Sequence, residues 1–123
     1  MHLSVEIKGQ TPAQKNAKKI AGRGGRAMLY TEKRVTDWQD SASIQLSACK
    51  VKFEGKVEIN YRFNVGDNSR RDIDKMIASV NDALVKAGII VDDDWKHLTI
   101  GMADARVDKE NPSAYLFIRS VDE

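Results

Sequence analysis

The chain lacks several features that would restrict where it works. It has one cysteine, Cys49, which cannot form a disulfide within the chain, and it has no run of 18 or more apolar residues. A membrane-spanning helix needs about 20 mostly apolar residues. The first residues, MHLSVEIKG, alternate like a strand and lack the apolar core of a signal peptide. We therefore expect a cytoplasmic protein that has no membrane partner and keeps its cysteine reduced.

The size and composition of the chain indicate one globular domain. Its 123 residues fall within the usual range for a single domain. Hydrophobic residues make up 41% and charged residues 31% of the chain, which is typical of soluble globular proteins. We expect a single domain over residues 1–123 that buries enough apolar surface to fold without disulfides.

The charge is unevenly distributed, although the net charge is only +2. Residues 1–34 hold eight basic and two acidic residues, a net of +6, which leaves −4 for the other 89 residues. Much of the positive charge lies in residues 10–26, QTPAQKNAKKIAGRGGR, which we expect to form a long flexible basic loop because of its proline and three glycines. Loops of this length are usually functional or disordered. A solvated surface loop and a phosphate-binding loop both fit this composition.

The spacing of apolar residues predicts the remaining secondary structure. Residues 57–65 alternate strictly between apolar and polar side chains, which is typical of a half-buried strand. Apolar residues spaced by three and four predict helices over residues 31–50 and 72–87, and Gly88 is a natural stop for the second helix. We expect further strands at residues 2–9, 89–91, 97–107 and 113–121. Together they predict an α+β domain in which a mixed sheet packs with two main helices.

Two groups of aspartates lie at the two ends of the second predicted helix: Asp72 and Asp74 lie at its start, and Asp92–Asp94 follow it. The helix covers about 20 Å at ~1.5 Å per residue, and an extended return from Gly88 covers roughly 17–20 Å at ~3.3 Å per residue. A helix packed against its own return strand would bring the two groups together. Clustered carboxylates repel one another and would attract a hard cation such as Mg²⁺. Acids at a helix N-terminus also favour the helix dipole, so spacing leaves a metal site and a plain helix start as alternatives.

The stretch RRDIDKMIASVNDALVKAGIIVDDD, residues 70–94, resembles the core motif of the RusA-like Holliday junction resolvases, a family of endodeoxyribonucleases often encoded by prophages. The family pattern is an Asp-x-Asp pair at the start of a helix, a DAL sequence, a glycine, and an Asp-Asp pair after a short strand. Upstream, TPAQKNAKK and GRGGRAMLYTEKRVTDW are similar to the family's N-terminal proline and basic loop, followed by an aromatic strand end and the first helix. The resemblance thus covers nearly the whole chain.

This resemblance implies a RusA-like fold and a Mg²⁺-dependent endonuclease, with Mn²⁺ as an alternative ion, that resolves four-way junctions in DNA recombination and repair. The implied metal ligands are Asp72, Asp74 and Asp93, with Asp92 as the candidate if the register differs by one. They would catalyse metal-assisted hydrolysis that leaves a 5′-phosphate and a 3′-hydroxyl. A four-way junction is two-fold symmetric, so a homodimer with two such sites would match it.

The family usually carries a catalytic lysine four residues after the second aspartate, where this chain has Ala78. Lys75 is therefore the candidate catalytic cation. The branched DNA would be held by basic residues, namely Lys15, Lys18, Lys19, Arg23, Arg26, Arg70 and Arg71. Trp95 could wedge against a base or cap the core, and we favour packing, whereas we interpret His97 as a surface residue.

Ala78 also favours an alternative, a catalytically weak or inactive relative that binds junctions or other DNA and keeps its acids as helix caps. A metal-dependent nuclease with a preference for flaps or single strands is a third possibility, because this preference depends on the geometry of the dimer.

Overall fold

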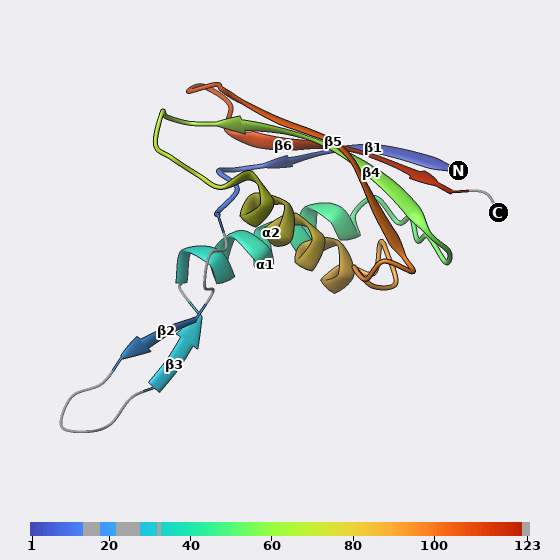
Figure 1. Ribbon diagram of the computed structural model, residues 1–123, viewed down its shortest axis with the longest axis horizontal. Coiled ribbons are helices and arrows are strands. Elements are labelled where there is room, and N and C mark those ends of the chain that lie inside the picture. The colour runs from blue at the N-terminus through green and yellow to red at the C-terminus, as the bar shows by residue number, and fades with distance from the viewer. Residues whose placement is uncertain (14–17, 22–27, 32, 122–123) are drawn as a thin grey trace.

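The computed structural model describes the backbone of residues 1–13, 18–21, 28–31 and 33–121, and the side chains of residues 1–13 and 33–121. The described chain forms a four-stranded mixed sheet, two helices and a separate two-stranded hairpin (Figure 1). The α+β class with a mixed sheet and two helices is therefore confirmed. Neither of the two helices in this part of the chain has the length and apolar character needed to cross a membrane.

The main sheet has the strand order β1-β6-β4-β5. Its strands are β1 His2–Lys8, β4 Val57–Val65, β5 Leu98–Val107 and β6 Ser113–Ser120. The predicted strand over residues 57–65 matches β4 at both ends because its apolar residues alternate without a break. β6 pairs antiparallel with both β1 and β4, whereas β4 and β5 are parallel. The apolar strand near the C-terminus is thus central, as its composition indicates.

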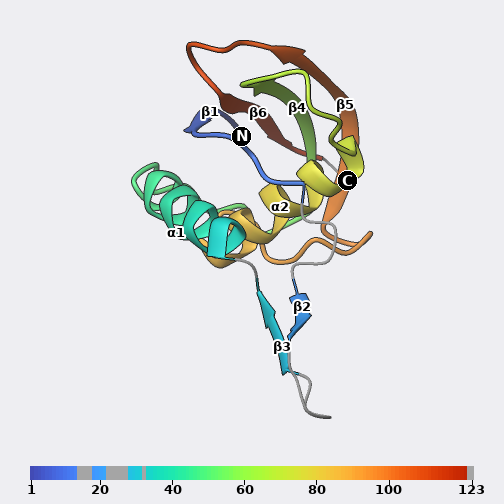
Figure 2. The same cartoon turned by 90° about the vertical axis from the view of Figure 1, so that its left-hand side faces the viewer.

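Both helices, α1 Lys33–Ser47 and α2 Ile73–Lys86, lie on one face of this sheet (Figure 2). They bury the stripes that their spacing predicts: Val35, Trp38, Ala42 and Leu46 of α1, and Met76, Ile77, Val80, Ala83 and Leu84 of α2. Each large apolar side chain that is fully buried contributes roughly 1.5–3 kcal/mol of transfer free energy. The layer between the helices and the sheet is therefore the core of the protein.

The helix α2 connects β4 to the parallel strand β5, as parallel neighbours require. It begins at the end of the sheet where β4 stops and ends where β5 starts (Figure 1). Gly88 has a φ of +77° directly after the helix, a left-handed conformation that glycine adopts without strain. One aspartate group lies at the start of α2 and the other follows its end, so the two groups lie at opposite ends of the crossover helix.

Two predictions about local structure are wrong. Residues 10–26 are not one long loop, because β2 Lys18–Ala21 within them pairs antiparallel with β3 Met28–Thr31. Residues 89–91 are not a strand, although Ile89 and Ile90 are buried. The Ile89 amide donates to the Leu84 carbonyl at 3.0 Å, and the Ile89 carbonyl accepts from the Phe53 amide at 2.8 Å. These bonds use the backbone groups of Ile89 that a sheet would need.

Candidate nucleic-acid interface

The turn before α2 is fixed by its own side chains. Arg71 Nη1 lies 2.8 Å from Asp67 Oδ1, and the same carboxylate accepts the Ser69 amide at 2.8 Å. The bond from Arg71, followed by the bonds from Ser69, holds the pKa of Asp67 well below its ordinary value. Arg71, a predicted DNA-binding residue, is therefore also a structural residue that shapes the loop ahead of the helix.

Asp72 is the N-cap residue of α2, and its backbone is extended with φ −78° and ψ 124°. Its carbonyl accepts the amides of Lys75 and Met76 at 3.1 and 3.2 Å, as at an ordinary helix start. Its carboxylate makes no capping bond. Instead, Asp72 Oδ2 lies 3.3 Å from Lys75 Nζ, and Asp72 Oδ1 lies 3.9 Å from Arg70 Nε. The Asp72 carboxylate is thus engaged by two neighbouring cations rather than by the amides of the helix start.

Asp74 lies in the first turn of α2, where an acid favours the positive end of the helix dipole. Its side chain is exposed and has no hydrogen bond or ion pair within the described residues. The start of α2 thus presents two carboxylates, with Arg70 and Lys75 beside Asp72. A helix N-terminus that also carries cations can hold an anionic phosphate.

The segment that leads into the hairpin is anchored to the same end of the molecule. Ser79 of α2 donates its hydroxyl to the Pro12 carbonyl at 2.7 Å, and the Gly66 amide donates to Gln10 Oε1 at 2.7 Å. From this anchor the hairpin β2–β3 projects away from the sheet and helices (Figure 1). Sequence spacing gives no sign of these two contacts, because they join residues 67 and 56 positions apart.

Of the predicted DNA-binding residues, those that the structure describes are divided between this helix start and strand β2. Lys18 and Lys19 lie on β2, where they pair in register with Thr31 and Tyr30. Lys15, Arg23 and Arg26 lie outside the described residues. Arg70 is the most exposed cation at the start of α2, since 92% of its side chain is accessible.

The second aspartate group forms a turn at the other end of α2. Asp94 Oδ1 accepts the amides of Lys96 and His97 and lies 2.7 Å from His97 Nδ1, and the contact with His97 lowers the pKa of Asp94. Asp93 is different, because desolvation and the neighbouring carboxylates of Asp92 and Asp82 raise its pKa. Asp94 is therefore a structural residue of the turn, whereas Asp93 is a carboxylate with unfavourable surroundings.

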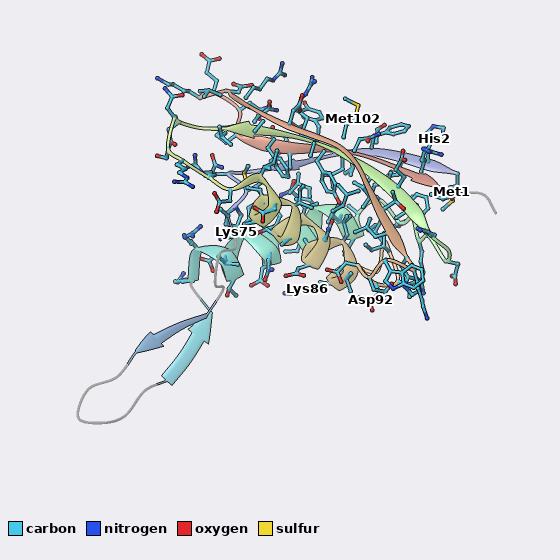
Figure 3. All side chains as sticks on the ribbon, viewed as in Figure 1. Met1, His2, Lys75, Lys86, Asp92 and Met102 are labelled. Carbon is cyan, nitrogen blue, oxygen red and sulfur yellow. The ribbon has the colours of Figure 1, made fainter. Side chains whose placement is uncertain are left out.

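The three predicted metal ligands do not come together within one chain. Among the described residues, no group of three or more His, Cys, Asp or Glu side chains is placed to hold a metal ion. Asp93 lies near Asp82, which follows Asp74 by eight residues and thus by about 12 Å of helix rise. Figure 3 shows Lys75 and Asp92 toward opposite ends of α2. The expected return strand is absent, so the chain does not run straight back to the helix start.

Two of the predicted ligands, Asp72 and Asp74, lie two residues apart at the start of α2. Mg²⁺ is often held by only one or two carboxylates and completes its octahedral shell with waters and substrate phosphates. Asp72 is half-buried and Asp74 is exposed, and their use as such a pair stays a prediction. The role of Asp93 as a metal ligand stays a prediction.

The interpretation of Trp95 as a packing residue is wrong, because 76% of its surface is exposed. Lys96 Nζ lies 5.8 Å from the centre of the Trp95 ring. Three aspartates precede Trp95 and a lysine and a histidine follow it, and this polar setting is the signal that indicates exposure. Trp95 is therefore an exposed residue of the turn and not part of the core.

Comparison with known proteins does not identify a family for this chain. No model of a known protein family matches the chain, and no curated protein is significantly similar to it.

Proposed function

We propose that this protein is a Mg²⁺-dependent endonuclease that acts on branched DNA, with the four-way junction as its substrate, and that two copies of the chain cut paired strands. The observation that carries this proposal is the start of α2. There, the half-buried carboxylate of Asp72 makes no capping bond and lies beside Arg70 and Lys75, and Asp74, two residues on, is exposed. Carboxylates beside cations at a helix N-terminus suit a phosphate that arrives with a metal ion.

The residues of the chain have separate tasks in this proposal. Asp72 and Asp74 would hold Mg²⁺, which lowers the pKa of a bound water and neutralises the scissile phosphate. Arg70 is free to reach a neighbouring phosphate, because its side chain is almost fully exposed and its contact with Asp72 is long, at 3.9 Å. Lys75 Nζ is the cation closest to Asp72, at 3.3 Å, and would stabilise the negative charge that grows on the phosphate during cleavage.

The hairpin supports binding to DNA rather than to a small phosphate. It carries Lys18 and Lys19 on β2, and it projects from the body near the anchor at Pro12 (Figure 1). A projecting basic arm adds phosphate contacts beyond the cleavage site, and each contact makes the affinity more sensitive to salt.

A second function, DNA binding without cleavage, is favoured by one specific observation. Lys75 and Arg70 already neutralise Asp72, while Asp93 lies far along α2 from the Asp72–Asp74 pair. An acid pair neutralised in this way can serve as a helix start without a metal ion.

Incubation with an end-labelled four-way junction separates the two functions. We expect the wild type to nick opposing strands in Mg²⁺ or Mn²⁺ and to leave a 5′-phosphate. Asp74→Asn should bind the junction but not cut it. Asp37→Asn is the matched control, because Asp37 is an exposed aspartate of α1 that pairs with Lys33 at 3.0 Å. Wild-type protein that binds the junction and never cuts it would leave only the DNA-binding function.

A further inference from the structure

Two loops meet at the end of the sheet where the parallel strands β4 and β5 begin (Figure 1). Residues 50–56 precede β4, and residues 91–97 precede β5. The loops are joined by the Val57 amide, which donates to the His97 carbonyl at 3.0 Å. We call the surface formed by residues 50–56 and 91–97 the strand-start corner.

Trp95 stands out from this corner, with 76% of its surface exposed. Tryptophan is highly buried in most proteins, so an exposed indole ring is unusual. Lys96 Nζ lies 5.8 Å from the centre of the ring, which places a cation beside it. The corner therefore presents a flat aromatic surface next to a positive charge, which is a combination that suits stacking with a nucleic-acid base.

The cations of the corner have no acid partner, whereas two of its acids are engaged inside the turn. Asp92 Oδ1 accepts the next backbone amide at 2.8 Å, and Asp94 Oδ1 accepts two amides of the turn at 3.1 Å. The lysines that make no ion pair within the described side chains are Lys50, Lys52, Lys56 and Lys96. These ammonium groups are available to phosphates.

The surroundings of Trp95 do not suit a protein partner. Lysine and aspartate are depleted at the centre of protein interfaces, yet Asp94 and Lys96 flank Trp95 directly. The other exposed large apolar residue of the corner is Val91, at 45%. A base supplies a flat apolar face and its phosphate supplies a negative charge, so a nucleotide matches both the ring and the free lysines.

The corner does not attract DNA from a distance. It has no net charge, because its four lysines are matched by Glu54 and the three acids of residues 92–94. Long-range steering needs an excess of one sign of charge. Stacking acts at contact, so the corner suits a strand that the basic residues at the start of α2 and on the hairpin already hold.

We propose that the strand-start corner binds an unpaired nucleotide of single-stranded DNA. The base stacks on the indole of Trp95, and Lys56 and Lys96 contact the neighbouring phosphates. Lys96 adjoins the ring, and Lys56 directly precedes Val57, whose amide bonds to this turn. Paired bases in a duplex hide their faces against one another, so the ligand of Trp95 is an unpaired base.

The distance from the acid pair to the corner rests on the proposed function. α2 has 14 residues and therefore spans about 21 Å between them. At ~3.4 Å per nucleotide of one strand, this span corresponds to roughly six nucleotides. A strand cut at the start of α2 would thus place an unpaired base on Trp95 roughly six nucleotides from the cut.

Binding of labelled oligo(dT) in EDTA, without metal or junction, tests the stacking site. Trp95→Ala should weaken binding about fivefold or more, the loss typical of one base–aromatic stack. Trp95→Phe should stay within about threefold of the wild type, because a phenyl ring also stacks. Ile44→Ala on α1 removes a similarly exposed apolar side chain (74% exposed) and should bind as the wild type does. Circular dichroism checks that each variant is folded.

Tryptophan fluorescence reports the contact itself. The chain has two tryptophans, and Trp38 is buried at 7% exposure. Oligo(dT) should therefore quench the emission of the wild type and leave the emission of Trp95→Phe unchanged.

The salt dependence of oligo(dT) binding tests the two lysines. Lys56→Ala with Lys96→Ala should reduce the slope of log affinity against log salt by about 1.4, since each phosphate contact on a single strand contributes ~0.7. Lys86→Ala is the control, because Asp40 already pairs with Lys86 at 2.9 Å, and it should leave the slope unchanged.

Wild-type protein that does not bind oligo(dT), Trp95→Ala that binds it as the wild type does, or quenching that persists in Trp95→Phe would each overturn the inference. Failure of the proposed function is distinguishable, because these assays contain no metal and no junction. A protein that stacks on oligo(dT) but never cuts a junction refutes the nuclease and leaves the corner as a binding site. A protein that cuts junctions while Trp95→Ala binds oligo(dT) normally refutes the corner alone.

Discussion

The hydroxyl of Ser79 donates to the carbonyl of Pro12 at 2.7 Å and thereby joins α2 to the segment that precedes the hairpin. Ser79 is fully buried, and its hydroxyl also lies 3.2 Å from the Lys75 carbonyl. One side chain thus connects the helix that carries the acid pair to the arm that carries basic residues.

Replacing Ser79 by alanine should loosen this connection. The Pro12 carbonyl would lose its partner in a buried place, at a cost of about 1–3 kcal/mol. We expect a lower free energy of unfolding in urea and a several-fold loss of affinity for junction DNA. Ser47→Ala, at the exposed end of α1, is the control and should change neither quantity. If Ser79→Ala binds DNA as the wild type does, the anchor has no role in placing the hairpin.

Gly101→Ala should destabilise the protein by about 1–3 kcal/mol. β5 has an irregular register here, and Asn60 Oδ1 accepts the Met102 amide at 2.7 Å. A methyl group on residue 101 would collide with that same Asn60 oxygen and lie 3.2 Å from the Ile59 carbonyl. Gly55→Ala is the matched control, because nothing lies within 4 Å of the added carbon. Equal unfolding midpoints for the two variants would contradict this close approach.

Asp93→Asn should stabilise the protein at pH 7. The pKa of Asp93 is raised in the folded chain, so its ionised form is less favourable there than in the unfolded chain. This cost in folding free energy is fully present above the raised pKa of the folded chain. It disappears as the pH falls from that raised pKa to the ordinary pKa of the unfolded chain. The gain from Asp93→Asn should therefore be present at pH 7 and absent at pH 3, as measured by urea unfolding.

Asp94→Asn should have the opposite effect at pH 7. The contact with His97 lowers the pKa of Asp94, so this carboxylate stabilises the fold above its unfolded pKa, and that contribution is lost as the pH falls through the lowered value.

For the first of these two variants, a destabilising effect of Asp93→Asn at neutral pH would show that the surroundings of Asp93 are favourable to its charge.

Lys75→Ala should slow cleavage of the junction on the order of 10²-fold, the loss typical for removal of one group that stabilises transition-state charge. Junction affinity should change less than threefold, because Arg70 and the hairpin retain their phosphate contacts. Lys86→Ala is the control at the other end of α2, where Lys86 pairs with Asp40 at 2.9 Å. A loss of affinity equal to the loss of rate would make Lys75 a DNA-binding residue only.

The elements with an unbroken hydrophobic period could be predicted from the sequence. The strict alternation of residues 57–65 defines β4, and the spacing before Gly88 predicts α2 to within one residue at each end. Ile89 and Ile90 show where such patterns fail, because a short apolar run has no period. Both side chains are buried without a strand, because the Ile89 backbone bonds to Leu84 and Phe53 instead of to a neighbouring strand.

The candidate site was only partly predictable for the same reason. Asp72 and Asp74 are only two residues apart in sequence, so their place at the helix start follows from the helix itself. The position of Asp93 depends on the path of the chain after α2. The strand predicted at residues 89–91 gives the wrong path, because these residues do not form a strand. The hairpin was missed because glycines and basic residues around KKIA and MLYT suggested a loop, although the two segments pair over four residues.

The central claim, that the acid pair at the start of α2 cleaves branched DNA, is tested most directly by the single-turnover rate of junction cutting at saturating protein in Mg²⁺. The account predicts that Asp74→Asn cuts at least 100-fold more slowly than the wild type, while Asp37→Asn cuts at the wild-type rate and all three bind the junction within about threefold of one another. Equal rates for Asp74→Asn and the wild type, or no cutting by the wild type in either Mg²⁺ or Mn²⁺, would contradict it.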